Sequence, residues 1–122
     1  MEKSSETGKK GEDFAIRYFK KLGYHILAKN HREKWGELDI IVRDPDKTIV
    51  FVEVKTINES NSQWVKPEDH FDIKKLDKVR RLSSFYANKN WQLINRDKGW
   101  RIDLIALTID NGNYAVSHYK NV

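Results

Sequence analysis

Two apolar segments joined by a short polar linker constrain this chain more than any other feature. The first begins at residue 36 and reads Gly-Glu-Leu-Asp-Ile-Ile-Val, and the second ends at residue 56 and reads Thr-Ile-Val-Phe-Val-Glu-Val-Lys-Thr. Both are typical of buried β-strands, and the linker over 43–47 is short enough to join them as a hairpin. However, the first carries Asp39, and the second carries Glu53 and Lys55. Because buried ionised groups are costly unless they are paired or bound to a metal, this pattern indicates a site.

Alternation along the two strands predicts how the hairpin pairs. Side chains point to opposite faces in turn, and directly opposed residues share a face. The apolar residues at 38, 40 and 42 form one face, and those at 50, 52 and 54 form its partner. Pairing these faces places Leu38 opposite Val54 and Asp39 beside Glu53, with Lys55 on the same face roughly 6.5–7 Å further along. The hairpin is therefore expected to gather two carboxylates and an ammonium at one end.

The remaining periodicity predicts an α/β (α+β) fold with a mixed central sheet flanked by helices. The predicted elements are a helix over 9–22, a strand over 24–28, hairpin strands over 37–43 and 48–56, a helix over 67–88, an extended piece over 91–94, and strands over 101–109 and 114–119. Gly11 on the first helix allows close approach of a neighbour, Gly23 ends that helix, and Asn111-Gly112 is a strong turn signal. The residues expected on the buried stripe of the second helix are Ile73, Leu76, Val79, Ser83, and Tyr86 or Ala87.

Length and composition limit the functions that this chain can have. Its 122 residues suit a single domain over 9–122, behind a polar tail over 1–8 that is expected to be disordered. It has no cysteine, no apolar run near the ~20 residues that span a bilayer and no secretory signal at its start, so a cytoplasmic protein without membrane contact is expected. The four histidines lack metal-ligand spacing, which argues against zinc. A net charge of +5 favours nucleic acid as the partner.

The acid pair favours a divalent metal ion over a structural role. A ladder of ion pairs on an exposed strand face is the plain alternative, but Ile41, Ile49 and Phe51 share this face and should be covered. Two carboxylates that are forced together repel each other unless a cation joins them. Their hard oxygen atoms suit Mg²⁺ or Mn²⁺, which keep positions open for water and phosphate and can activate the water.

Six blocks of sequence, spread over nearly the whole chain, carry a family resemblance. They are Gly8-x-x-Gly11-Glu12-Asp13-x-Ala15, Gly23-Tyr24, Asn30-x-Arg32, Gly36-Glu37-x-Asp39-Ile40-Ile41, Phe51-Val52-Glu53-Val54-Lys55-Thr56 and Arg101-x-Asp103. In this order they resemble the YraN-like family of endonucleases, a branch of the PD-(D/E)xK nuclease superfamily. The resemblance implies a restriction-endonuclease-like αβββαβ core and hydrolysis of phosphodiester bonds with Mg²⁺ or Mn²⁺. It also implies DNA rather than RNA as the substrate, with branched, Holliday-junction-like DNA as one form, and a homodimer by analogy with junction-cleaving relatives.

The resemblance also assigns roles to the acid cluster. It implies that the side chains of Asp39 and Glu53 and the backbone carbonyl of Val54 face the metal. Neighbouring carboxylates favour the protonated form of Lys55, so we expect it to orient the water and stabilise the phosphate. A role for Lys55 as a base stays open if the metal cancels the acid charges.

Two further acids are candidates for the same site. Glu12 lies on the first helix, where it is either a solvated residue of the first turn or a helix-borne carboxylate that completes the metal site. Glu37 lies two residues before Asp39 on the same face. It is a second ligand, a hydrogen-bond acceptor behind the ligands, or an exposed strand end.

Basic residues on both sides of the acids are candidates for nucleic-acid binding. On the second helix, Lys74, Lys78 and Arg81 fall at i, i+4 and i+7 and form one stripe, which is either a solvated face or a phosphate contact. Before the hairpin, the candidates for backbone contacts are Asn30, His31, Arg32 and Lys34. Trp35 and Trp64 lie in loops beside the site and either stack on bases or pack against protein.

Two further observations concern residues outside the acid cluster. Ile57 stands where the resembled family usually has Arg, which removes a candidate phosphate contact. That departure favours an alternative function, a nucleic-acid-binding module on a nuclease scaffold without turnover. Arg101 and Asp103 share a strand face and are interpreted as a structural salt bridge at the end of the sheet.

Overall fold

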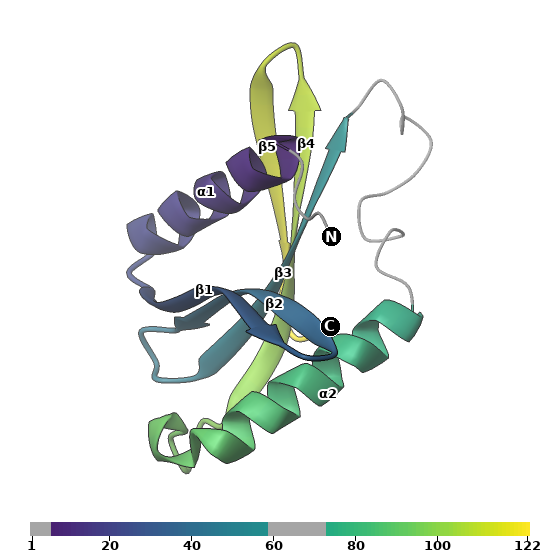
Figure 1. The fold of residues 1–122 in the computed structure, drawn as a ribbon. Coiled ribbons are helices and arrows are strands. Elements are labelled where there is room, and N and C mark those ends of the chain that lie inside the picture. Colours follow the sequence, from purple (N-terminus) through teal and green to yellow (C-terminus); the bar gives the residue numbers. More distant parts are fainter. Residues whose placement is uncertain (1–5, 59–72) are drawn as a thin grey trace.

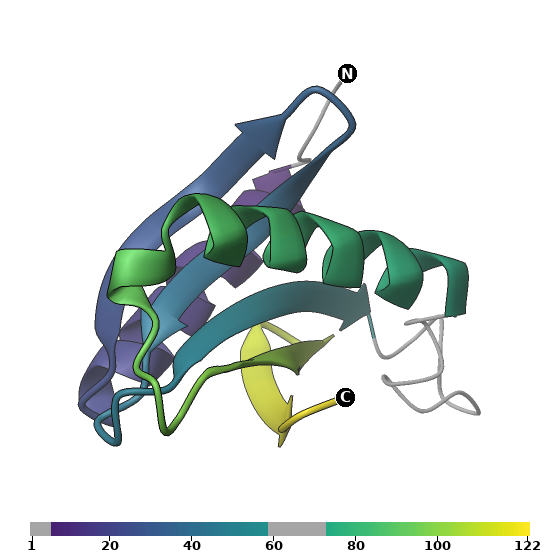
Figure 2. The same ribbon diagram turned by 90° about the horizontal axis from the view of Figure 1, so that it is seen from below.

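A five-stranded mixed sheet with a helix against each face forms the framework of the protein (Figures 1 and 2). The computed structural model describes residues 6–58 and 73–122. Its elements are α1 (Glu6–Lys21), β1 (His25–Glu33), β2 (Gly36–Arg43), β3 (Ile49–Asn58), α2 (Ile73–Lys89), the 3₁₀ helix η3 (Trp91–Leu93), β4 (Trp100–Asp110) and β5 (Asn113–Tyr119). The strands lie in chain order, and β3 and β4 are the parallel pair, connected through α2. The predicted α/β fold and element order are confirmed.

The predicted register of the central hairpin is also confirmed. In the antiparallel pairing of β2 and β3, Ile40 lies opposite Val52 and Val42 lies opposite Val50. The ladder ends at Ile40 and Val52, one residue before Asp39 and Glu53 would follow as the next pair. The two strands therefore stop exchanging backbone hydrogen bonds where their acid residues begin.

Each face of the sheet holds its own apolar core. Against α1, the core contains Ala15 and Phe19 with the β2 and β3 residues Ile40, Val42, Val50 and Val52. Against α2, it contains Val79 and Leu82 with Ile41, Ile49 and Phe51. Gly11 allows α1 to approach β3 closely, because a Cβ atom there would overlap the Thr56 hydroxyl group. Strand alternation thus explains the two layers, with one exception: Leu38, predicted on the face of Ile40 and Val42, packs in the α2 core.

Several predicted boundaries are wrong, and each error has a physical reason. β1 continues to Glu33 through residues that were predicted as a polar stretch, because backbone pairing with β2 stabilises an edge strand of polar side chains. Residues 91–93 form a 3₁₀ helix instead of an extended piece. α1 begins at Glu6, so residues 6–8 of the predicted disordered tail are helical. The predicted start of the second helix at 67–72 and Trp64 lie outside the described residues.

The buried stripe of α2 also differs from the prediction. Ile73 is 77% exposed, whereas Leu82 is buried with Val79, Ser83 and Ala87. A stripe that advances by three residues drifts by about 60° at each step on an α-helix. Ile73 therefore lies outside the face that Val79 and Leu82 define.

The predicted glycine signals are confirmed. Gly23 at φ +90° ends α1 as predicted, and the Asn111-Gly112 turn has the positive φ angles, 52° and 81°, of a tight hairpin.

A buried ionic network ties β4 and β5 to the turn of the β2–β3 hairpin. Asp103 is fully buried and accepts hydrogen bonds from Arg101 Nε at 2.9 Å, His118 Nε2 at 2.7 Å and the Asn121 backbone at 3.0 Å. Burial alone would raise the pKa of Asp103, but the hydrogen bonds from His118 and Arg101 outweigh it and hold the pKa below its ordinary value. Arg101 also reaches Asp44 at 3.2 Å. The structural interpretation of Arg101 and Asp103 is confirmed.

Replacing Asp103 with Asn should therefore destabilise the fold. Asp103→Asn leaves the buried Arg101 guanidinium without its main counter-charge, at an expected cost of about 2–4 kcal/mol in the free energy of unfolding at pH 7. Because the folded pKa of Asp103 is depressed, this contribution is present above the unfolded pKa and is lost as the pH falls through the folded value. Urea unfolding followed by circular dichroism measures it. The matched control is Asp110→Asn at the exposed end of β4, which should change stability by less than about 0.5 kcal/mol; equal effects of the two variants would contradict the expectation.

Candidate functional site

The site begins where the β2–β3 ladder ends. There the Asp39 carboxylate accepts a hydrogen bond from the Val54 backbone N–H, with a distance of 2.9 Å between Oδ2 and N. The Asp39 side chain thus accepts a hydrogen bond of the kind that backbone carbonyl groups accept in the rest of the ladder. Since the N–H and C=O of a strand residue point toward the same neighbouring strand, the Val54 carbonyl faces the same opening. Asp39 and this carbonyl are therefore held at one strand edge by the local backbone.

Glu53 completes the acid pair from β3. Its side chain is nearly buried, at 6% exposed, and it shares a hydrogen bond with Asp39. On its other side, Glu53 Oε2 lies 2.6 Å from Nζ of Lys75, a half-exposed residue near the start of α2. Lys55 follows on β3, is exposed, and acts electrostatically on Glu53. Two carboxylates and two ammonium groups therefore meet between the hairpin and α2.

The burial of the two acids raises the pKa values of both. Burial and then the charge of Glu53 raise the pKa of Asp39 to about 8, against the hydrogen bond from Val54 and the charge of Lys75. Burial also raises the pKa of Glu53, although Lys75 opposes that shift. Burial therefore favours a form of the pair that keeps a proton. A divalent cation could take the place of that proton and satisfy both carboxylates.

A second group of acids lies behind the pair. With the Asn30 amide oriented so that its nitrogen faces the carboxylates, this nitrogen donates to Glu37 Oε2 at 3.0 Å and to Glu12 Oε1 at 3.1 Å. Arg32 lies 3.6 Å from the other oxygen of Glu37. The charge of Glu37 also contributes to the raised pKa of Asp39. Asn30 therefore connects α1 to the hairpin and brings Glu12 and Glu37, both partly buried, to the same region.

Two side chains and one backbone carbonyl are the groups that could hold a metal ion. In the described residues, no three or more His, Cys, Asp or Glu side chains converge on one point as metal ligands. The available donors are instead Asp39, Glu53 and the Val54 carbonyl. This set suits Mg²⁺, which is usually bound through one or two carboxylates and keeps several waters. Glu12 and Glu37 then lie close enough to act on the site through Asn30 and through charge.

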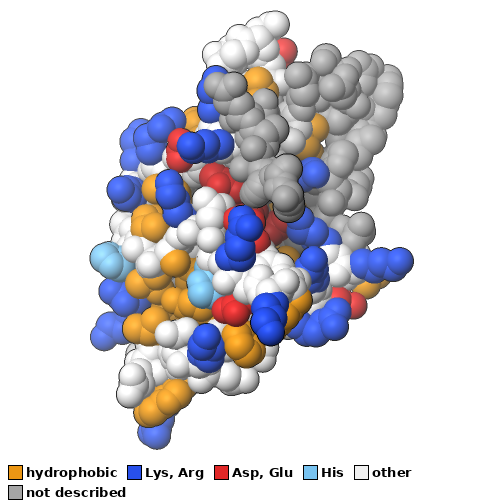
Figure 3. Space-filling view, in the orientation of Figure 1, with side chains coloured by type: hydrophobic (Ala, Val, Ile, Leu, Met, Phe, Trp, Pro, Cys, Tyr) orange, Lys and Arg blue, Asp and Glu red, His pale blue; other side chains and the backbone are white. Residues whose placement is uncertain are grey.

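The predicted basic residues fall into two groups. Lys74, Lys78 and Arg81 are exposed and lie along one flank of α2, and Lys34 is exposed at the β1–β2 turn. Arg32 is exposed and pairs with Glu37. Figure 3 shows acidic side chains gathered at the centre of one face of the molecule, with Lys and Arg side chains around them.

The sequence analysis missed Lys75 and the bridging role of Asn30. A signal for Lys75 was present, because it lies four residues before Val79 and seven before Leu82, on the buried stripe of α2. A lysine on a buried stripe requires a partner, and the acid on β3 was available. Asn30 carried no such signal, since its contacts depend on how α1 packs against the hairpin.

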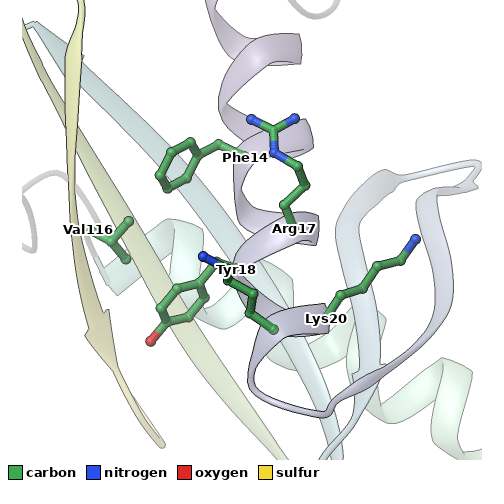
Figure 4. Close-up of a pocket in the computed structure, with 6 residues that line it drawn as sticks. Phe14, Arg17, Tyr18, Lys20 and Val116 are labelled. Carbon is green, nitrogen blue, oxygen red and sulfur yellow. The ribbon is translucent and has the colours of Figure 1, made fainter.

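A separate cavity of about 660 Å³ lies between α1 and β5 (Figure 4). Its lining residues are Phe14, Arg17, Tyr18, Lys20, Lys21 and Val116. Phe14 and Tyr18 point toward Val116, whereas Arg17 and Lys20 point away from the strand. None of the lining residues is acidic, so this cavity offers no carboxylate to a metal ion.

These features define a class: a small α/β protein whose mixed sheet holds a buried acid pair at the open end of a hairpin. Comparison with known proteins then shows the family. The pattern of Uncharacterised protein family UPF0102 matches residues 11–107, which include every residue of the acid cluster. The chain belongs to this family.

Individual relatives match along almost their whole length. A UPF0102 protein of Persephonella marina is 38% identical over 115 residues, covering 93% of this chain and 90% of the relative. One from Thermotoga maritima is 36% identical over 115 residues, covering 93% and 94%. One from Bacteroides thetaiotaomicron is 34% identical over 120 residues, covering 98% and 93%. Among the described helices, none is long and apolar enough to cross a membrane.

The raised pKa of Asp39 predicts a pH-dependent cost to stability. Because the folded protein keeps a proton that the unfolded chain releases between about pH 4 and 8, wild-type stability should fall as the pH rises through that range. Asp39→Asn keeps an acceptor for Val54 N–H and removes the charge. In buffer with EDTA it should be about 1–3 kcal/mol more stable than wild type at pH 8, and close to wild type near pH 4.5.

Thermal unfolding at the two pH values measures this difference. The control is Asp77→Asn on α2, whose side chain is 57% exposed and which should show no such dependence on pH. An Asn variant that gains nothing between pH 4.5 and pH 8 would show that Asp39 ionises without cost in the folded state.

Proposed function

We propose that this protein is a nuclease that depends on Mg²⁺ or Mn²⁺ and hydrolyses phosphodiester bonds in DNA. One observation supports the proposal most: Asp39, which is partly buried, and Glu53, which is buried, lie side by side at the open end of the hairpin, with Lys75 bound to Glu53 at 2.6 Å. Strongly perturbed carboxylates beside cations are characteristic of functional sites. The resemblance to the YraN-like branch of the PD-(D/E)xK superfamily gives the same residues this chemistry.

In this proposal Asp39, Glu53 and the Val54 carbonyl would hold the metal. When bound, the metal would lower the pKa of a water molecule and neutralise charge on the phosphoryl oxygens. Lys55 would orient the attacking water and stabilise the phosphate through its ammonium group. Lys75 supplies a second ammonium group on the opposite side of Glu53, where it can offset the charge that develops on the phosphate.

The acids behind the pair hold the site together. Asn30 ties Glu12 on α1 to Glu37 on β2, which fixes the helix against the strand that carries Asp39. The negative charge of Glu37 also strengthens the demand for a cation at Asp39. Glu12 and Glu37 are thus proposed to position the residues that would hold the metal.

The basic surface is proposed to bind the substrate backbone. The residues assigned to phosphate contacts are Arg32, Lys34, Lys74, Lys78 and Arg81. A net charge of +5 favours a polyanion, and counterion release would make the binding salt-dependent. DNA rather than RNA, branched DNA as one substrate, a homodimer and a cytoplasmic location are parts of the same proposal.

Cleavage assays test the proposal directly. Wild-type protein with Mg²⁺ or Mn²⁺ should cut at least one of linear duplex, single-stranded and four-way-junction DNA. Asp39→Ala and Lys55→Ala should each lower the rate by about 10²–10⁴-fold, as expected when a transition-state contact is removed. Asp77→Ala, an exposed acid outside the cluster, should cut at the wild-type rate.

Two results would contradict the proposed nuclease activity. One is wild-type protein that cuts none of the three substrates. The other is cleavage by the Asp39 and Lys55 variants at the wild-type rate. Salt-dependent DNA binding that does not require metal and persists after loss of Glu53 would instead support the alternative function, a nucleic-acid-binding module without turnover. The presence of Ile57 favours that alternative. In the structure Ile57 is 6% exposed and contributes to packing.

The contact between Lys75 and Glu53 makes a second, more specific prediction. In the metal-free protein the Lys75 ammonium group is bound to the Glu53 carboxylate. A divalent cation that enters the site must therefore compete with Lys75 for this carboxylate. Lys75→Met should therefore tighten Mn²⁺ binding about 3- to 10-fold, which corresponds to roughly 0.7–1.4 kcal/mol, while it slows cleavage at least about tenfold. Isothermal titration calorimetry and single-turnover cleavage measure the two effects.

Lys74→Met is the matched control for metal affinity, because Lys74 is the adjacent lysine and is exposed. It should leave Mn²⁺ affinity within about twofold of wild type. Glu53→Gln should abolish saturable binding. If Lys75→Met weakens Mn²⁺ binding, the ammonium group supports the metal site instead of competing for it.

A further inference from the structure

The basic stripe of α2 continues into an aromatic residue. Lys74, Lys78 and Arg81 are followed at the same helical phase by Phe85 and Lys89, so the five residues fall within an arc of about 80°. Phe85 is 36% exposed and the four cations are exposed. Asp77, the only acid in the α2 sequence, lies outside this arc. This flank of α2 therefore presents one aromatic ring among positive charges.

The β1–β2 turn lies against this flank and adds a second aromatic ring. A Cβ atom at Gly36 would lie 2.9 Å from both Lys78 and Leu82, so the glycine lets the turn approach α2 closely. Beside it, Trp35 is 44% exposed and meets Phe85 edge to face, with ring centroids 5.3 Å apart. Figures 1 and 2 both place the turn next to α2. We call Trp35 and Phe85 together the aromatic platform.

Strand β2 leads directly from the platform to the acid pair. Trp35 precedes Glu37 by two residues and Asp39 by four, which is about 13 Å of extended strand. That is the length of about four nucleotides in a stacked strand. Lys34 at the turn and Lys89, whose Nζ lies 5.2 Å from the Phe85 ring centre, add positive charge at its edges. A DNA strand that crosses the acid pair would thus reach the platform within a few nucleotides.

We propose that the aromatic platform binds an unpaired base of the strand that is cut, so that the protein selects single-stranded or branched DNA over intact duplex. This inference rests on the proposed nuclease function. An exposed indole ring can stack on any base that has left the helix, whereas bases inside a duplex already stack on each other. The surrounding lysines and Arg81 hold the flanking phosphates. A second copy of this chain fits poorly, because it would bring the same positive charges to the contact.

DNA binding without metal tests the platform independently of cleavage. Fluorescence anisotropy in EDTA would compare a labelled single strand of about 12 nucleotides with a hairpin duplex of the same sequence. Trp35→Leu should lose about tenfold in affinity for the single strand and little for the duplex, because it keeps apolar bulk without an aromatic face. Trp35→Phe should retain most of the affinity. Trp91→Leu, a 68% exposed tryptophan on η3, is the matched control and should bind as wild type does.

Two results would overturn the platform. The first is Trp35→Leu protein that binds the single strand as tightly as wild type. The second is a wild-type dimer, measured by light scattering, that Trp35→Leu converts to a monomer, since the patch would then be a contact between protein chains. If DNA binding depends on Trp35 but the protein cuts no DNA, the proposed nuclease activity is wrong and the proposed role of the aromatic platform stands. If the protein cuts DNA but replacing Trp35 does not change DNA binding, only the proposed role of the aromatic platform is wrong.

Discussion

The hydrogen bond from the Val54 backbone to the Asp39 carboxylate is the interaction on which the site depends. It replaces a backbone carbonyl with an ionisable side chain at the position where the β2–β3 ladder ends. The replacement keeps the Val54 N–H satisfied while the two strands separate, so the sheet can open without leaving a buried donor unpaired. The opening is what brings Asp39, the Val54 carbonyl and Glu53 to one place. Without that bond, the ladder would either continue and bury the acids or fray and expose them.

Two opposite charge patterns coexist in this small protein. The chain is basic overall, with a net charge of +5, yet Asp39 and Glu53 bring two acids together between the hairpin and α2. The two networks meet different physical needs. Asp103 is surrounded by Arg101, His118 and a backbone N–H, so its pKa is lowered and its charge is satisfied within the fold. Asp39 and Glu53 have raised pKa values, because the effect of burial outweighs the charges of the nearby lysines.

The sequence predicted the hairpin well because two independent constraints agree there. Period-two alternation fixes which residues share a face, and both apolar faces would be spoiled by a slip of one residue. The register of Ile40 with Val52 and the approach of Asp39 to Glu53 follow from that. Where only one weak signal was present, the prediction was wrong. Residues 29–33 look polar and loop-like, but pairing with β2 makes them an edge strand. Ile73 looks like a core residue by its spacing, but helical drift places it in solvent.

Local pattern by itself thus determined the element order, the central register and the three residues Asp39, Glu53 and Lys55 as neighbours, because strand alternation acts over a few residues. Tertiary structure alone decided what surrounds them. The contact of Lys75 with Glu53 depends on how α2 lies across the sheet, and the bridge of Asn30 between Glu12 and Glu37 depends on how α1 does. Both helices are placed by the packing of their apolar faces against the two sides of the sheet. Local periodicity indicates which side of a helix faces the sheet, but it does not specify where along the sheet the helix lies.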